Sequence, residues 1–173
     1  MKYSIDNSIF YNQLVFSDYS ENITTMFGEL DNDEINTLLR SQVIGRIGCQ
    51  TDGKLYIVPI TYVFDGDSII GHTAEGMKTD IMRKNPNVCF EIDYVENMLN
   101  WQSVIAWGIY EELQGNDARL AMQKLINKIQ PLITNETSLQ THGIEAHQLE
   151  TGGKKIIIYR IKITEKTGRF EKI

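Results

Sequence analysis

Several features that would assign a sequence to a specialised class are scarce or absent in this chain. It has two cysteines, Cys49 and Cys89, with no Cys-x-x-Cys motif and no pair of histidines near either. This pattern argues against a metal site and favours reduced thiols in the core. No Gly-x-Gly-x-x-Gly motif follows a strand, so a built-in nicotinamide-binding domain is not expected.

Positive charge and long apolar runs are also scarce. Lysine and arginine number 17 against 23 aspartates and glutamates, and they do not cluster with aromatic residues, so nucleic acid is a poor candidate partner. No apolar run approaches the ~20 residues that cross a membrane. The first residues lack the basic start and apolar stretch of a secretory signal. We therefore expect a soluble, cytoplasmic protein.

The composition that is present suits one folded domain. The 173 residues are 42% hydrophobic and 23% charged, which is enough to bury a core without disulfides or metals. Residues 1–27 carry scattered aromatics without a helical or strand period. We interpret 1–27 as an N-terminal extension and 28–173 as a single domain.

Local patterns predict alternating strands and short helices. Asp31 and Glu34 form a capping box that starts a helix ending near Ser41. A second helix covers 79–84 and stops before Pro86, and a third starts at Asn116 or Asp117 and distorts or ends near Pro131. Period-2 patterns and turn residues predict six strands, at 43–49, 55–64, 68–73, 87–94, 103–113 and 154–164. These elements indicate a β-dominated α+β fold, a six-stranded, mostly antiparallel barrel with flanking helices.

Two local motifs point to chemistry. The run from Gly71 to Lys78 combines a hydroxyl, glycines, a helix N-terminus and a lysine, which together favour an anion. An ordinary polar corner between strand and helix is the alternative. Pro59 lies inside a strand and cannot donate to a ladder, so we expect that strand to be at an edge, bulged or opened there.

Four ordered blocks resemble a known family. They are Val43–Gly48, Val58–Tyr62, His72–Lys78 and Asn85–Phe90, and the resemblance continues through Tyr159–Thr164 and Thr167–Arg169. The chain resembles the FMN-binding split β-barrels of the pyridoxamine 5'-phosphate oxidase-like superfamily, and within it the nitroimidazole-resistance (Nim) group most closely. The resemblance covers about residues 26–170 and implies a homodimer with two FMN molecules in clefts at the subunit interface.

The resemblance also assigns site residues. It implies that Pro59, Ile60, Thr61 and Tyr62 line the isoalloxazine and ribityl chain, that His72, Thr73 and Ala74 lie alongside, that Lys78 holds the phosphate, and that Ser103 supplies a polar group from a neighbouring strand. The residue chemistry agrees, because the Thr73 hydroxyl, amides near Gly76 and Lys78 suit a phosphate dianion.

Other roles stay open for several side chains. His72 is a candidate catalytic proton donor, a structural strand-end histidine, or an axial ligand if the chain binds haem in place of FMN. Trp107 suits a core or dimer interface better than a substrate platform, and Arg46 suits pairing with Glu91 or Asp93. His142 and His147 are interpreted as surface residues of a polar loop.

The expected function is that of an FMN-dependent, nitroreductase-like oxidoreductase. Its substrates would be small aromatic or nitroimidazole-type acceptors, with reduced nicotinamide binding transiently. A non-catalytic flavin- or haem-binding module is the alternative from another class. True pyridoxamine 5'-phosphate oxidase is disfavoured, because the family pattern Arg-x-His is absent from the end of the chain, Gly168–Ile173.

Overall fold

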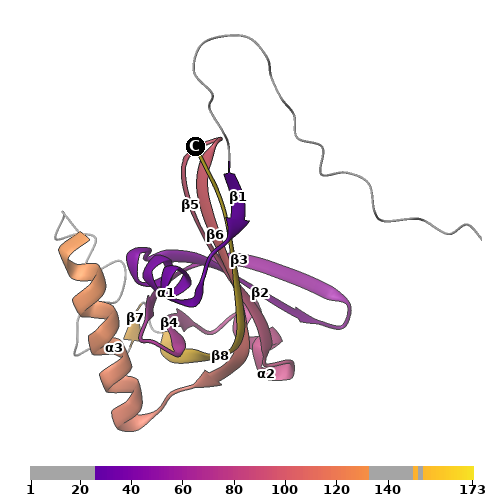
Figure 1. The fold of residues 1–173 in the computed structure, drawn as a ribbon. Helices are drawn as coiled ribbons and strands as arrows, with labels where there is room; N and C mark the ends of the chain where they lie inside the picture. Colours follow the sequence, from indigo (N-terminus) through magenta and orange to yellow (C-terminus); the bar gives the residue numbers. More distant parts are fainter. Residues whose placement is uncertain (1–25, 133–149, 152–153) are drawn as a thin grey trace, which may run out of the picture.

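The computed structural model describes residues 26–132, 150–151 and 154–173, and its fold is drawn in Figure 1. Strands dominate this part of the chain, and three α-helices lie between them. The elements are β1 (Met26–Glu29), α1 (Asn32–Ser41), β2 (Ile44–Thr51), β3 (Lys54–Phe64), β4 (Ser68–Ala74), α2 (Met77–Lys84), β5 (Asn87–Asn97), β6 (Asn100–Glu112), α3 (Gly115–Ile129), a 3-10 turn (Gln130–Leu132), β7 (Glu150–Thr151) and β8 (Lys154–Lys172).

The strands form one antiparallel sheet that closes on itself. Its order is β1-β8-β4-β3-β2-β5-β6, and β6 also pairs with β8. The 19-residue β8 makes the closure possible, because its first part pairs with β4 and a longer stretch pairs with β6. The predicted β-dominated barrel is confirmed, with all six expected strands present. Two short strands, β1 and β7, add to them, and β8 runs well beyond the predicted end at Thr164.

One part of the sheet extends beyond the barrel as an arm. The arm consists of the C-terminal half of β5, the N-terminal half of β6, the C-terminal end of β8, and β1 (Figure 1). Trp101 Nε1 ties the arm together by donating to the Glu171 carboxylate at 2.7 Å. Because β1 starts at Met26, the sheet begins two residues before the expected domain start at 28.

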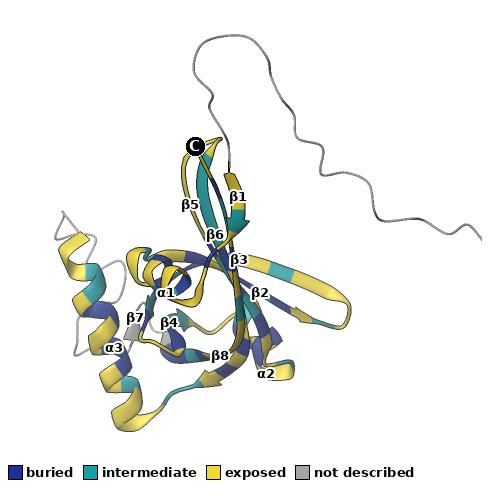
Figure 2. Ribbon diagram, in the orientation of Figure 1, coloured by how far each residue is buried: buried dark blue, intermediate teal, exposed yellow. Residues whose placement is uncertain are grey.

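Buried side chains of the strands form the core of the barrel, and the buried stretches of these strands are dark blue in Figure 2. Tyr62 and Phe90 meet edge to face, 4.8 Å between ring centroids. Helix α1 closes one end, and the Tyr62 hydroxyl donates to the Leu39 carbonyl at 2.8 Å. A second apolar cluster lies between α3 and strands β4 and β8, formed by Ile70, Ala121, Met122, Leu125, Ile126, Ile156 and Ile158.

The helix starts show where local prediction worked and where it missed. The capping box is confirmed, since Asp31 Oδ1 accepts from the Glu34 amide at 2.9 Å and Glu34 Oε2 accepts from the Asp31 amide at 2.8 Å. The predicted cap of α3 at Asn116 or Asp117 was wrong, because the N-cap is Gln114. The side-chain oxygen Oδ1 of Asn116 instead accepts from the Arg119 guanidinium at 3.0 Å.

Candidate functional site

Strands β3 and β4 separate part-way along their length. Within the described residues they pair only over Tyr62–Phe64 and Ile69–Gly71, so Tyr62 and Gly71 form the last pair. Beyond it, the Pro59–Thr61 stretch of β3 stays paired with β2, and the His72–Ala74 stretch of β4 stays paired with β8. Pro59 thus lies where, among the described residues, β3 pairs with β2 alone, which confirms the edge position, one of the three alternatives expected there. We call the two stretches, where β3 and β4 have parted, the split; both of its edges carry backbone groups outside a β3–β4 ladder.

The two stretches of the split present different groups. Pro59 is exposed and Thr61 half-buried on the outward face of β3, whereas the side chains of Ile60 and Tyr62 point into the core. Burial raises the pKa of Tyr62 above its ordinary value. At Ile60 and Tyr62, therefore, the main chain and not the buried side chain faces away from the core.

On the β4 side the expected residues lie in sequence along one edge. His72 and Thr73 are half-buried and Ala74 is exposed. The Thr73 hydroxyl donates to the Ala74 carbonyl at 3.1 Å, so it must rotate if it is to donate to a ligand. This edge leads directly to Gly76 and the first turn of α2.

The start of α2 is held by Thr79. Its buried hydroxyl accepts from the Gly76 amide at 3.0 Å and donates to the Gly76 carbonyl at 2.7 Å. The Gly76 amide is therefore committed to the turn. An anion at this helix start would be met by Lys78 and by other amides of the first turn, where the helix dipole also favours negative charge.

Lys78 is half-buried beside the barrel end. Its Nζ lies 5.9 Å from the centroid of the Tyr159 ring, and among the described residues it takes part in no ion pair, unlike Lys84 and Lys124. Burial lowers the pKa of Lys78, and the nearby Cys49 partly opposes this shift. A desolvated ammonium without a carboxylate is stabilised by a bound anion, which restores the lost charge interaction.

Tyr159 supports Lys78 from β8 and was not anticipated as a site residue. The side chain is fully buried, and its hydroxyl finds no hydrogen-bond partner among the described residues. Burial raises the pKa of Tyr159, with a smaller contribution from Cys49. Gly71 faces it across the β4–β8 ladder, where a Cβ at position 71 would lie 2.6 Å from the tyrosine oxygen. Gly71 is thus required by packing against Tyr159 and not by an anion.

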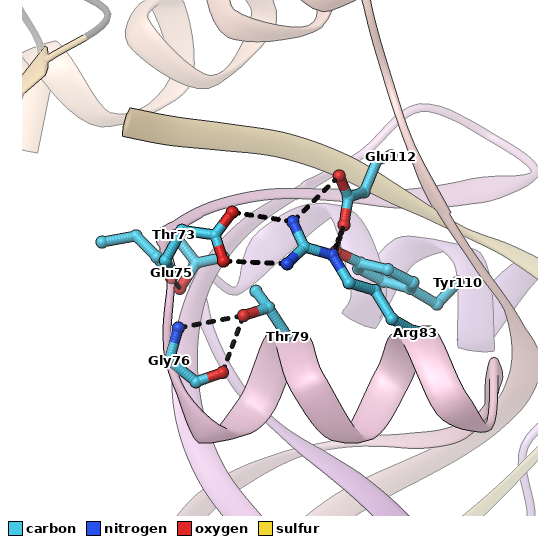
Figure 3. A network of polar contacts seen from close by, with 8 residues as sticks. Thr73, Glu75, Gly76, Thr79, Arg83, Tyr110 and Glu112 are labelled. Atoms are coloured by element: carbon cyan, nitrogen blue, oxygen red, sulfur yellow. Dashed lines mark hydrogen bonds and ion pairs between the residues drawn. The ribbon is translucent and has the colours of Figure 1, made fainter. Parts of the chain in front are cut away.

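An ion-pair network anchors the other side of the same corner (Figure 3). The guanidinium of Arg83 on α2 donates to both oxygens of Glu75, at 2.8 and 2.9 Å. It also donates to Glu112 at the end of β6, from Nε at 2.6 Å, and the Tyr110 hydroxyl donates to Glu112 at 3.0 Å. No local sequence pattern indicates this network, because Arg83 and Glu112 lie 29 positions apart.

Ser103 does not join the split within one chain. It lies on the arm, paired with Asp93 of β5 and Arg169 of β8. His72 pairs with Ile158, eleven positions earlier on β8. The structure therefore places the other predicted site residues around one opening and Ser103 well away from it.

The outward face of the barrel carries an apolar row. In register across β6, β5, β2 and β3 lie Trp107, Cys89, Gly48 and Ile57. We call these four residues the outer row; Trp107 and Ile57 are 40% and 59% exposed, so Trp107 is not a core residue of the single chain. Cys49, in contrast, is buried in the core.

Next to the outer row, Arg46 donates to Glu91 at 3.1 Å and to Asp93 at 3.0 Å, as predicted. The predicted surface residues His142 and His147 lie outside the described residues.

The chain matches one protein family over most of its length. The family described as pyridoxamine 5'-phosphate oxidase matches residues 31–170. The chain belongs to this family. The matched range contains β3, β4, α2 and nearly all of β8, so the whole split lies within the pyridoxamine 5'-phosphate oxidase-like part of the chain.

Individual relatives support the fold assignment. An uncharacterised protein of Rhizobium meliloti is 27% identical over 148 residues, covering 81% of this chain and 92% of that protein. The crystal structure of an FAD-binding protein from Mesorhizobium loti is 27% identical with a TM-score of 0.66, covering 84% and 98%. A candidate 5-nitroimidazole antibiotic resistance protein from Bacteroides thetaiotaomicron has the same fold at 16% identity, with a TM-score of 0.63 and coverage of 90% and 96%.

Among the residues that the structure describes, no helix is long and apolar enough to cross a membrane. The histidines, cysteines and acidic residues in the same part of the chain form no group of three or more that could hold a metal ion.

Proposed function

We propose that this chain binds FMN in the split and acts as an oxidoreductase through it. The observation that carries the proposal is Lys78, a half-buried ammonium without an ion pair in the described structure, at the helix start where the split ends. A phosphate dianion is the kind of group such a lysine binds most strongly. The likeness to a protein named as FAD-binding, at 27% identity, supports a flavin.

Different residues along the split would bind different parts of FMN. The outward side chains of Pro59 and Thr61 and the main chain of Ile60 and Tyr62 would line the flat ring and the ribityl chain, with His72, Thr73 and Ala74 on the other edge. Lys78 would hold the phosphate. When bound, a flavin supplies hydride and electron transfer, chemistry that no side chain here provides.

His72 is the candidate for proton transfer in this arrangement. It is half-buried on the β4 edge of the split, and an imidazole titrates close to neutral pH. It would donate a proton to a small aromatic or nitroimidazole-type acceptor as negative charge develops there. A His72→Ala variant should keep its cofactor and lose turnover; full turnover in that variant would refute the role.

The proposal includes a homodimer in which the outer row is the contact. Ile57, Pro59 and Thr61 alternate onto the same outward face of β3, so a second copy seated on the outer row would also cover the split. Ser103, which lies far from the split of its own chain, would then be available to the partner's cofactor. Sedimentation should show a dimer for the wild type and a monomer for Trp107→Glu. A monomeric wild type would contradict this part of the proposal.

The experiment that tests the cofactor is a visible spectrum and mass analysis of the purified protein. Oxidised-flavin absorption with the mass of FMN would support the proposal. The mass of FAD would still support a flavin site at the split but would contradict FMN as its cofactor. A Soret band would favour the haem-binding module. A colourless preparation that fails to bind added FMN would refute flavin binding altogether.

Turnover separates an enzyme from a binding module. Reduced nicotinamide and a nitroaromatic acceptor should be consumed together by the FMN-loaded protein. The same assay with pyridoxamine 5'-phosphate should show no product, because the Arg-x-His ending is absent. Bound FMN that no reduced nicotinamide can reduce would favour the non-catalytic module.

A further inference from the structure

We infer that Arg83 is a positioning residue for the anion site: it holds and neutralises the Glu75 carboxylate, so that Lys78 and the first turn of α2 stay available to phosphate. This inference rests on the proposed function and extends it to a residue that does not contact the cofactor. It follows from the geometry of the corner between β4 and α2 (Figure 3).

The Arg83 side chain links its own helix to two other parts of the fold. It projects from α2, and its terminal nitrogens donate to both oxygens of Glu75 in the loop after β4, at 2.8 and 2.9 Å. Its Nε and one terminal nitrogen donate to the two oxygens of Glu112, at 2.6 and 3.3 Å. A planar guanidinium with five donors can serve two carboxylates in this way, and a lysine cannot.

The second acid of the network is itself fixed. Glu112 ends β6 and accepts from the Tyr110 hydroxyl at 3.0 Å. The hydrogen bond from Arg83 lowers the pKa of Glu112, with partial burial acting in the opposite direction and Tyr110 adding to the lowering. Glu112 is therefore ionised at neutral pH and keeps the guanidinium between the two acids.

The position of Glu75 explains why it must be held. It lies three residues before Lys78 and directly before Gly76, the N-cap of α2. A carboxylate released there would be attracted by the amides of the first turn and by the charge of the Lys78 ammonium. It would therefore compete with a phosphate for the same donors, and its charge would repel the dianion.

The exposure of the network separates this role from simple stabilisation. The Arg83, Glu75 and Glu112 side chains are 40%, 48% and 28% exposed, and ion pairs this accessible to water contribute little to folding. Loss of Arg83 should consequently appear in anion binding far more than in thermal stability.

The test compares FMN with riboflavin, which has the same ring and ribityl chain but no phosphate. Dissociation constants for both are measured by flavin fluorescence on wild type, Arg83→Met, Arg83→Lys, Glu75→Gln and the double variant Arg83→Met/Glu75→Gln. The control is Arg160→Met, which removes another exposed ion pair, Arg160 with Glu111 at 2.8 Å.

We expect Arg83→Met to weaken FMN roughly tenfold, the effect expected when the released Glu75 carboxylate takes one charge-assisted contact from the phosphate, with riboflavin affinity almost unchanged. Arg83→Lys should recover part of the loss. The double variant should recover most of it, because a neutral amide at position 75 no longer competes with phosphate. Glu75→Gln alone should bind FMN at least as tightly as wild type, and Arg160→Met should match wild type.

Two results would overturn the inference while leaving the proposed function intact. One is an equal loss of FMN and riboflavin affinity in Arg83→Met, which would mark Arg83 as a general structural clamp. The other is a double variant no better than Arg83→Met, which would show that Glu75 is not the competitor. Wild-type protein that binds neither flavin would overturn the proposed function and this inference together.

Discussion

The two sides of the barrel satisfy their polar groups to different degrees. On the side formed by β2, β5 and β6, β2 pairs with β5 over Arg46–Cys49, the β5–β6 ladder stays in register from Asn87 to Val95, and Arg46 is matched by Glu91 and Asp93. On the side of the split, β3 and β4 part after Tyr62 and Gly71, and Lys78 and the Tyr159 hydroxyl lack the partners that such groups normally have in the described structure. Buried polar groups in folded proteins are usually satisfied, so this incomplete pairing supports the ligand site proposed at the split.

The largest expected effect is on the free energy of unfolding, when a side chain is added at Gly71, which packs against Tyr159. Gly71→Ala would place a methyl group 2.6 Å from the ring and oxygen of Tyr159, and the Tyr159 side chain is fully buried. We expect a loss of about 3 kcal/mol in the free energy of unfolding, measured by denaturant titration.

The matched control is Gly48→Ala on the fully paired side, where the nearest atom is 3.6 Å away. It should cost far less than Gly71→Ala. Equal losses at positions 48 and 71 would contradict the view that Gly71 is required by its contact with Tyr159.

Next in size is the effect of removing the unmatched charge. Lys78→Met should weaken FMN binding by about 1.5–3 kcal/mol, or roughly 10–100-fold, because a charge-assisted contact to the phosphate is lost. Fluorescence titration with FMN and riboflavin measures it. Lys124→Met, which removes an ammonium already paired with Asp65 at 2.9 Å, should leave both affinities unchanged. A Lys78→Met variant with wild-type FMN affinity would remove the main support for the proposed site.

Two buried tyrosines give a smaller and more direct contrast. Tyr62→Phe removes a hydroxyl that donates to the Leu39 carbonyl, so we expect about 1 kcal/mol of destabilisation. Tyr159→Phe removes a hydroxyl without a partner in the described residues, so stability should stay the same or rise. Thermal unfolding of the cofactor-free protein measures both. A cost at Tyr159 as large as at Tyr62 would mean that its hydroxyl is satisfied.

The sequence was sufficient for local features and insufficient for distant ones. The capping box at Asp31 and the alternation of β5 and β6 are encoded within a few residues, and the predicted elements follow them. Lys78 was proposed as a site residue for the same reason, because it belongs to an unbroken motif. Tyr159 was missed because its role depends on pairing with Gly71, which lies 88 positions earlier. The position of Ser103 depends on the path of the 19-residue β8, which no local pattern specifies.

The smallest expected effect is a pH dependence of stability at Lys78. Burial lowers its pKa in the folded state, so on the alkaline side the unfolded chain binds more protons at this position than the folded chain does. The buried charge of Lys78 therefore lowers the free energy of unfolding. This destabilisation is complete below the lowered pKa and disappears as the pH rises toward the ordinary lysine pKa of about 10.4. The free energy of unfolding of cofactor-free wild type, measured against Lys78→Met, should therefore improve between neutral pH and pH 10. A difference that stays constant over this range would show that the ammonium is fully hydrated, and would place Lys78 with the matched, solvent-exposed cations of the other side.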